Sequence, residues 1–248
     1  MQNPIVNGDA VVGKFLVPDA PLSTGVLAEY YNQNALEAQE NFDANDWADP
    51  EHMLAQFRYL TTHFDMQGKS LLDVGSGNGL LFSHLEKENI KLEYASAIDL
   101  ASEQINILKK LHPTVEAITG DFMAYEFERS FDVVTMFGLV PCVKFIYPGK
   151  HPVGSLIKVI DKAIRYAHDA VCFSFLNKAV YEQCEEEGYD YAYFYPDEVA
   201  AILTGGAFEL STKDNDLIVN CILHIHDGNE EPFRFNMQRI DKMFGLFR

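Results

Sequence analysis

Three acidic side chains each follow a short apolar segment, and glycines come directly after the first of them. Residues 71–79 read Leu-Leu-Asp-Val-Gly-Ser-Gly-Asn-Gly, while Asp99 closes the segment 94–99 and Asp121 follows the segment 114–119. Glycines let the chain turn sharply and let a ligand approach the backbone. Carboxylates can accept two hydrogen bonds at once, and a helix that starts after the glycines points free N–H groups at an anion. This order is typical of a nucleotide-cofactor site.

The elements that position these residues follow from the spacing of apolar side chains. Strands are predicted at 70–74, 93–98, 114–119, 131–137 and 170–176, alternating with helices near 79–88, 102–111 and 153–167. Such alternation predicts parallel strands with crossover helices on both faces. A further helix begins at Pro196, and the segments 208–211 and 217–226 are predicted to be strands joined by a polar turn. The fold class is therefore α/β: a doubly wound, mostly parallel seven-stranded sheet with an antiparallel C-terminal strand pair.

The segment before the first strong strand is predicted to be an arm and a helical lid, spanning residues 1–66. Residues 1–22 show no clear period and are expected to be an extended arm or short hairpin. Helices are predicted from Ser23-Thr24 towards Leu36 and from Asp49-Pro50 to Phe64. The main domain is then 67–248, with an aromatic-rich insertion near 180–195.

Composition narrows the class of protein and its partners. The 248 residues carry a formal net charge of −18, which disfavours nucleic acid and anionic membranes as partners. The four cysteines are widely spaced without a C-x-x-C pair, so no metal site or disulfide framework is expected. No 18-residue apolar stretch and no secretory leader are present in the sequence, which makes a cytoplasmic protein, monomeric or homodimeric, the expectation.

The glycine spacing distinguishes between two kinds of cofactor site. A dinucleotide fingerprint G-x-G-x-x-G counted from Gly75 would place its third glycine at Leu80. The sequence instead reads D-x-G-x-G-x-G, which resembles motif I of the class I S-adenosylmethionine-dependent methyltransferases. The segments Tyr94–Asp99, Gly120–Phe122 and Phe131–Phe137, with the loop Gly138–Pro141, resemble the motifs that follow in that family. The resemblance covers roughly residues 48–226.

The resemblance implies S-adenosyl-L-methionine as the cofactor and assigns roles along it. In the family, an acid such as Asp73 orients the loop and helps to place the amino group of the cofactor, and one such as Asp99 holds the ribose hydroxyls. Asp121 would accept from the adenine amine, while Phe122 would pack on the purine. The expected cofactor-binding residues are Asp73, Gly75, Gly77, Asn78, Gly79, Asp99, Leu100, Asp121, Phe122, Phe137 and Leu139. The local alternatives are a helix cap for Asp99, a turn for Asp121 and simple core packing for Phe122.

Methyl transfer from a sulfonium needs mainly alignment and a dry site, so no catalytic triad is required. The candidates for catalytic side chains are Tyr30 and Tyr31 in the expected lid and His151 in a loop after the fourth strand. Packing roles are the alternative for all three. Residues 188–195 carry tyrosines at every second position, which predicts either an aromatic wall for substrate or a packed hairpin.

A methyltransferase acting on an O or N atom of a small organic molecule is the function expected from these features. No Asn-Pro-Pro-Tyr-like tetrad follows the fourth strand, and the metal-ligand acids of catechol-type enzymes are missing from 137–140. Three alternatives remain: an enzyme that cleaves or cyclises S-adenosylmethionine itself, a non-catalytic binding subunit, and an NAD-dependent oxidoreductase.

Overall fold

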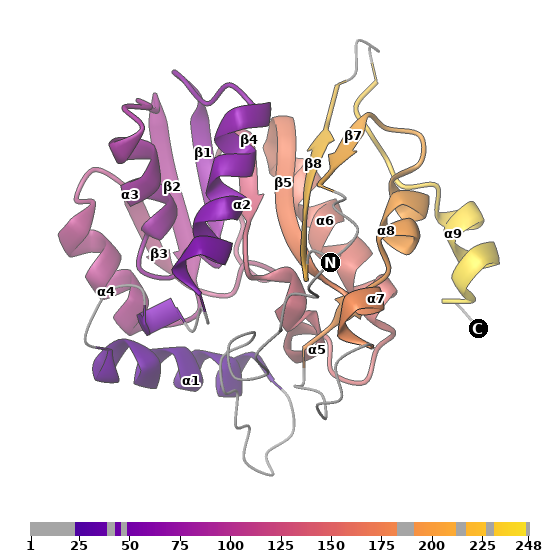
Figure 1. The fold of residues 1–248 in the computed structure, drawn as a ribbon, viewed down its shortest axis with the longest axis horizontal. Helices are drawn as coiled ribbons and strands as arrows, with labels where there is room; N and C mark the ends of the chain where they lie inside the picture. Colours follow the sequence, from indigo (N-terminus) through magenta and orange to yellow (C-terminus); the bar gives the residue numbers. More distant parts are fainter. Residues whose placement is uncertain are drawn as a thin grey trace, which may run out of the picture.

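A single mixed β-sheet organises the chain in the computed structural model (Figure 1). The structure describes residues 23–38, 43–45, 49–182, 191–211, 217–226 and 231–246. Its strands are β1 (Ser70–Val74), β2 (Tyr94–Asp99), β3 (Glu116–Thr119), β4 (Phe131–Met136), β5 (Ala167–Asn177), β6 (Tyr193–Phe194), β7 (Phe208–Leu210) and β8 (Ile218–His224). The order is β3-β2-β1-β4-β5-β8-β7, with the short β6 also pairing with β5.

The strands run parallel except at the C-terminal end of the chain. β8 is antiparallel to both of its neighbours, β5 and β7. The predicted fold class, a mostly parallel doubly wound sheet with an antiparallel C-terminal pair, is therefore confirmed. The order also places β2 and β3 on one side of β1, and β4 and β5 on the other.

Helices cover both faces of this sheet. They are α1 (Thr24–Glu37), α2 (Pro50–His63), α3 (Leu80–Lys87), α4 (Ser102–Leu111), α5 (Val143–Ile146), α6 (Pro152–Tyr166), α7 (Lys178–Tyr181), α8 (Pro196–Leu203) and α9 (Met237–Phe244), with short 3-10 helices η1 (Asp43–Asn45) and η2 (Val140–Cys142). Pro50 and Pro152 occupy the first turns of α2 and α6, where the missing N–H costs nothing.

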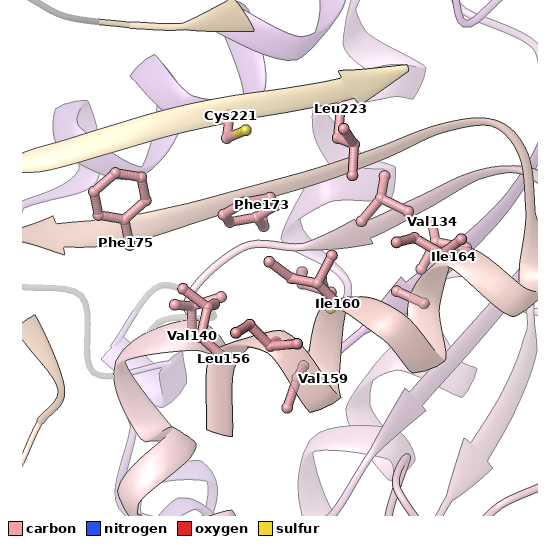
Figure 2. Close-up of a cluster of buried hydrophobic side chains, with 14 of the residues drawn as sticks. Val134, Val140, Leu156, Val159, Ile160, Ile164, Phe173, Phe175, Cys221 and Leu223 are labelled. Carbon is pink, nitrogen blue, oxygen red and sulfur yellow. The ribbon is translucent and has the colours of Figure 1, made fainter. Parts of the chain in front are cut away.

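Alternate side chains of the strands supply two separate cores. Leu72 and Val134 point to the face covered by α6 and α8, whereas Leu71 and Val133 point to the face covered by α2, α3 and α4. Figure 2 shows the first core, in which the apolar stripe of α6 packs against β4, β5 and β8. Its labelled members are Val134, Val140, Leu156, Val159, Ile160, Ile164, Phe173, Phe175, Cys221 and Leu223.

The N-terminal elements lie at the carboxyl end of the strands, where ligands bind in open α/β sheets. α1 contacts α4 and α5 across this edge (Figure 1). Leu27 of α1 is buried with Phe145, Leu176 and Tyr191 in a small third cluster. The division of the chain at residue 66 stays a prediction.

Some elements were not predicted, and some predictions fall outside the described residues. The short α5, α7, β6 and η1 have too few residues for the sequence pattern to reveal them, and the C-terminal α9 was not predicted either. The expected arm 1–22 and the turn between β7 and β8 lie outside the described residues. Among the helices that are described, none is long and apolar enough to cross a membrane.

Candidate functional site

A cavity of about 160 Å³ opens at the carboxyl end of β1, β2, β4 and β5. Eight of the eleven residues expected to bind the cofactor line it: Gly75, Gly77, Asp99, Leu100, Asp121, Phe122, Phe137 and Leu139. Segments that are far apart in the sequence thus meet around one space. The remaining three, Asp73, Asn78 and Gly79, lie outside its lining.

The glycine loop has a backbone that other residues rarely adopt. Gly75, Gly77 and Gly79 have φ values of 68°, 52° and 88°, in the left-handed region that glycine tolerates best. A Cβ on Gly77 would lie 1.7 Å from Oδ1 of Asn45, and one on Gly79 would lie 2.9 Å from the His112 ring. Both positions therefore require glycine on conformational and steric grounds.

Asp99 fixes the loop as well as facing the cavity. One carboxylate oxygen accepts a hydrogen bond from the Gly77 amide at 2.9 Å, and the other accepts from the Ala101 amide at 2.8 Å. Burial raises the pKa of this carboxyl, and the backbone hydrogen bonds oppose that shift. Each oxygen keeps a second lone pair for a ligand hydroxyl. The residue at the N-cap of α4 is Ala101, so Asp99 is not the helix cap considered as its alternative role.

The segment after β3 is held in place by a buried lysine of α6. Asp121 accepts a hydrogen bond from the Met123 amide at 2.8 Å, which is the local turn considered above. The Lys162 ammonium donates to the carbonyls of Met123 and Tyr125 at 3.0 and 2.6 Å, and lies 5.6 Å from the centre of the Phe122 ring. Phe122 belongs to the core and lines the cavity at the same time.

Asp73 is buried behind the loop, at 4% exposure. It sits opposite Thr135 in the sheet register, and the Thr135 hydroxyl donates to Asp73 Oδ1 at 2.7 Å. Burial raises the pKa of this carboxyl to about 7; the hydrogen bond from Thr135 lowers it, and the charge of Asp99 raises it. Asp73 lines a smaller adjoining cavity together with Asn45, Phe57 and Phe137.

Three amide side chains that the sequence analysis did not single out also line the cavity. Asn45 lines both cavities and donates to Asn78 Oδ1 at 2.6 Å, which gives the fully buried Asn78 a role in anchoring η1. Gln56 of α2 and Gln104 of α4 line the larger cavity and are both 1% exposed. A signal existed for the two glutamines, because each interrupts an apolar helix stripe at a position that packing would otherwise assign to a hydrophobic residue.

The other half of the cavity is mainly apolar. Ser174 and Tyr191 supply hydroxyls there, and the remaining lining comes from α1, η2, α5, β5 and β8: Leu27, Pro141, Cys142, Ile146, Phe175, Leu176 and Ile218. No Lys, Arg or His belongs to the lining in the part of the chain that the structure describes. This half suits an uncharged or weakly polar organic molecule.

The candidate catalytic residues are separated by the fold. Tyr31 lines the cavity. Tyr30 does not, and its ring packs edge-on against the ring of Tyr31, with 5.3 Å between the ring centres. His151 is exposed just before α6 and lies outside the lining. Its place in the sequence, in a loop after the fourth strand, predicted that it would lie near the substrate. In the structure it is the N-cap residue of α6.

The predicted tyrosine wall is not continuous in the described residues. Tyr191 lines the cavity, whereas Tyr193 stacks on Tyr181 at 3.9 Å and Tyr195 donates to the Glu182 carboxylate at 2.7 Å. β6 spans only Tyr193–Phe194, so the alternation of a long strand does not apply. Tyr189 lies outside the described residues.

The chain is similar to known methyltransferases over part of its length. Residues 71–145 match a family model described as a methyltransferase domain. The chain is 32% identical over 80 residues to the cypemycin N-terminal methyltransferase of a Streptomyces species, covering 32% of this chain and 31% of that protein. It is 30% identical over 154 residues to a ubiquinone biosynthesis O-methyltransferase of Xanthomonas oryzae pv. oryzae, covering 48% and 63%.

Solved structures resemble the whole fold more than they resemble the sequence. The magnesium protoporphyrin IX methyltransferase from Synechocystis PCC 6803 with bound SAH superposes with a TM-score of 0.58 at 13% identity, covering 81% of this chain and 99% of that one. This likeness concerns the fold. The chain spans between about a third and two thirds of the length of the curated relatives it matches. Residues 71–145 are thus similar to a methyltransferase domain, and the strand order together with the structural likeness shows a Rossmann-like fold.

Proposed function

We propose that the protein is an S-adenosylmethionine-dependent methyltransferase that modifies an O or N atom of a small organic molecule. The observation that carries this proposal is the Asp99 carboxylate, which is tied to the Gly77 amide and faces a cavity shared with the end of β3 and the loop after β4. The two Asp99 oxygens can accept hydrogen bonds from the two hydroxyls of a ribose. The names of the relatives support the same class of reaction.

The residues present fit the cofactor along its length. Asp99 offers acceptor lone pairs for the ribose hydroxyls, and Asp121 with Phe122 offers an acceptor and a ring for the adenine. The glycine loop removes the side chains that would block the methionine portion. When bound, the cofactor supplies a methyl group on a positively charged sulfur.

The chain itself contributes alignment and exclusion of water. Phe137 and Leu139 line the middle of the cavity, between the acids of β2 and β3 and the apolar half. The apolar half would bury an organic acceptor and hold its nucleophilic atom in line with the methyl group, which is the main requirement of this displacement. Among the candidate bases, Tyr31 is the one that faces this space. A proton leaving an acceptor hydroxyl would pass to it or to water.

A transfer assay tests the proposal. The purified protein is incubated with S-adenosylmethionine and a panel of phenols, carboxylic acids and amines, and the products are separated by mass spectrometry. We expect S-adenosylhomocysteine together with an acceptor heavier by one methylene. Methylthioadenosine formed without any acceptor would instead identify an enzyme that cleaves the cofactor. Binding without turnover across a broad acceptor panel would favour a non-catalytic subunit.

A further inference from the structure

Gln56 has a carbonyl oxygen with no hydrogen-bond partner in a place where such an oxygen is costly. The side chain is 1% exposed on the apolar stripe of α2, beside Met53, Phe57 and Leu60. Its Nε2 donates to the His52 carbonyl at 3.4 Å in the preceding helical turn, whereas Oε1 has no partner among the described residues. A buried acceptor without a donor destabilises the folded protein. Because Gln56 lines the larger cavity, a bound ligand can supply the missing donor.

The sheet order indicates which part of the cofactor lies near Gln56. Asp121 and Asp99 mark the adenine and ribose positions at β3 and β2, so the rest of the cofactor crosses the glycine loop of β1 towards β4. Gln56 is on the β4 side, because the ring of the next residue, Phe57, lies 5.8 Å from the ring of Phe137 at the end of β4. The amino-acid end of the cofactor is the portion that reaches this side.

The amino-acid end carries one group whose hydrogen bonding is entirely of the donor kind. An ammonium has three N–H donors and no acceptor, which complements an amide oxygen, and hydrogen bonds to charged donors are the stronger ones. The carboxyl group of Asp73 lies in the adjoining cavity with Phe57 and Phe137, so a second acceptor oxygen is near the same position. The lining of the larger cavity contributes no basic side chain from the described residues to compete for this place.

We propose that Gln56 Oε1 accepts a hydrogen bond from the α-ammonium of the cofactor and positions its amino-acid end. This inference rests on the proposed function and adds a specific residue of α2 to the site. Gln56 is a binding residue in this account, and α2 acts as the wall that recognises the amino-acid end.

Gln104 provides an internal comparison at the ribose position of the cofactor. It is also 1% exposed and lines the same cavity, its Nε2 donates to the Ala44 carbonyl, and its Oε1 is also without a partner in the described part of the chain. It belongs to α4, which follows Asp99, so its oxygen is expected to meet a ribose hydroxyl. The two glutamines should therefore respond to different parts of one ligand.

Titration calorimetry with two ligands separates these positions. S-adenosylhomocysteine has the amino-acid end, and methylthioadenosine lacks it while keeping adenine, ribose and sulfur. We expect Gln56→Leu to weaken S-adenosylhomocysteine about 10- to 100-fold, the loss of one hydrogen bond to a charged group, and to leave methylthioadenosine within about twofold. Gln104→Leu should weaken both ligands by similar factors. The exposed Gln67→Leu should affect neither.

The Gln56→Glu variant decides between the two charged groups of the amino-acid end. A glutamate there keeps an acceptor for the ammonium. The affinity for S-adenosylhomocysteine, divided by the affinity for methylthioadenosine, should therefore stay at or above its wild-type value. A larger loss of S-adenosylhomocysteine than in Gln56→Leu would show a carboxylate contact and overturn the proposal. This variant also carries the test if Gln56→Leu does not fold. Equal effects of Gln56→Leu on both ligands, or none on either, would refute the inference; failure of the wild-type protein to bind either ligand would refute the proposed function itself.

Discussion

Asp73→Asn should change how the stability of the protein depends on pH. Burial raises the pKa of Asp73 to about 7 in the folded protein, against 3.8 for an ordinary aspartate. The folded state therefore holds a proton between these values that the unfolded chain has released. Because a raised carboxyl pKa stabilises the folded state at low pH, this contribution is lost as the pH rises towards 7.

The magnitude follows from the width of that interval. Between pH 5 and pH 7 the carboxyl is protonated when folded and ionised when unfolded, so each pH unit costs about 1.36 kcal/mol. Because the folded carboxyl is about half ionised at pH 7, the wild-type protein should lose about 2 kcal/mol over these two units relative to Asp73→Asn, and the difference should level off above pH 7. The asparagine oxygen can still accept the hydrogen bond from Thr135, so the fold should be kept.

Urea unfolding of both proteins at pH 5, 6, 7 and 8 measures this difference. The other carboxyl groups are common to both chains, so their contributions largely cancel when the two free energies of unfolding are subtracted. Thr135→Val serves as the companion variant: loss of the hydroxyl removes the interaction that lowers the pKa of Asp73, so its pH dependence should extend to higher pH. Parallel stability curves for wild type and Asp73→Asn would refute the burial argument.

Three further changes test the loop and its supports. Gly77→Ala places a methyl group 1.7 Å from Oδ1 of Asn45, so S-adenosylhomocysteine affinity should fall at least about tenfold on steric grounds, whereas Gly68→Ala, with positive φ but no atom within 4 Å, should lose only stability. Asp99→Asn should weaken S-adenosylhomocysteine by about 100-fold, the value of one or two charged hydrogen bonds; unchanged calorimetric affinity would remove Asp99 from the site. Lys162→Met removes hydrogen bonds to two carbonyls and should cost about 1–3 kcal/mol of unfolding free energy, and an unchanged denaturation midpoint would contradict its role in holding 121–126.

The half of the cavity that contains the glycine loop, Asp99 and Asp121 was predictable, because local sequence patterns specify it. The glycine loop and the acids Asp99 and Asp121 each follow a strand directly, and parallel strands bring their carboxyl ends to one edge. Strand and helix bounds were close to those observed; α4 spans Ser102–Leu111 as expected. In such segments, the spacing of apolar residues and the residue types at the two ends are enough to specify the element.

The apolar half of the cavity depends on contacts between distant segments, which the spacing of residues in the sequence does not specify. Leu27, Cys142 and Tyr191 come together only because α1, η2 and the segment before β6 pack in one cluster. His151 illustrates the opposite case, because it is close to the site in sequence but lies outside the cavity lining. Gln56 and Gln104 could have been found from the sequence, because a polar residue within an apolar helix stripe requires a partner that the helix does not provide.

Calorimetric titration of the wild-type protein with S-adenosylhomocysteine, with NAD as the control ligand, tests the central claim most directly. We expect one binding site per chain for S-adenosylhomocysteine and no detectable heat of binding for NAD. Binding of NAD, or absence of binding for S-adenosylhomocysteine in a folded sample, would contradict the assignment of the glycine loop and of Asp99.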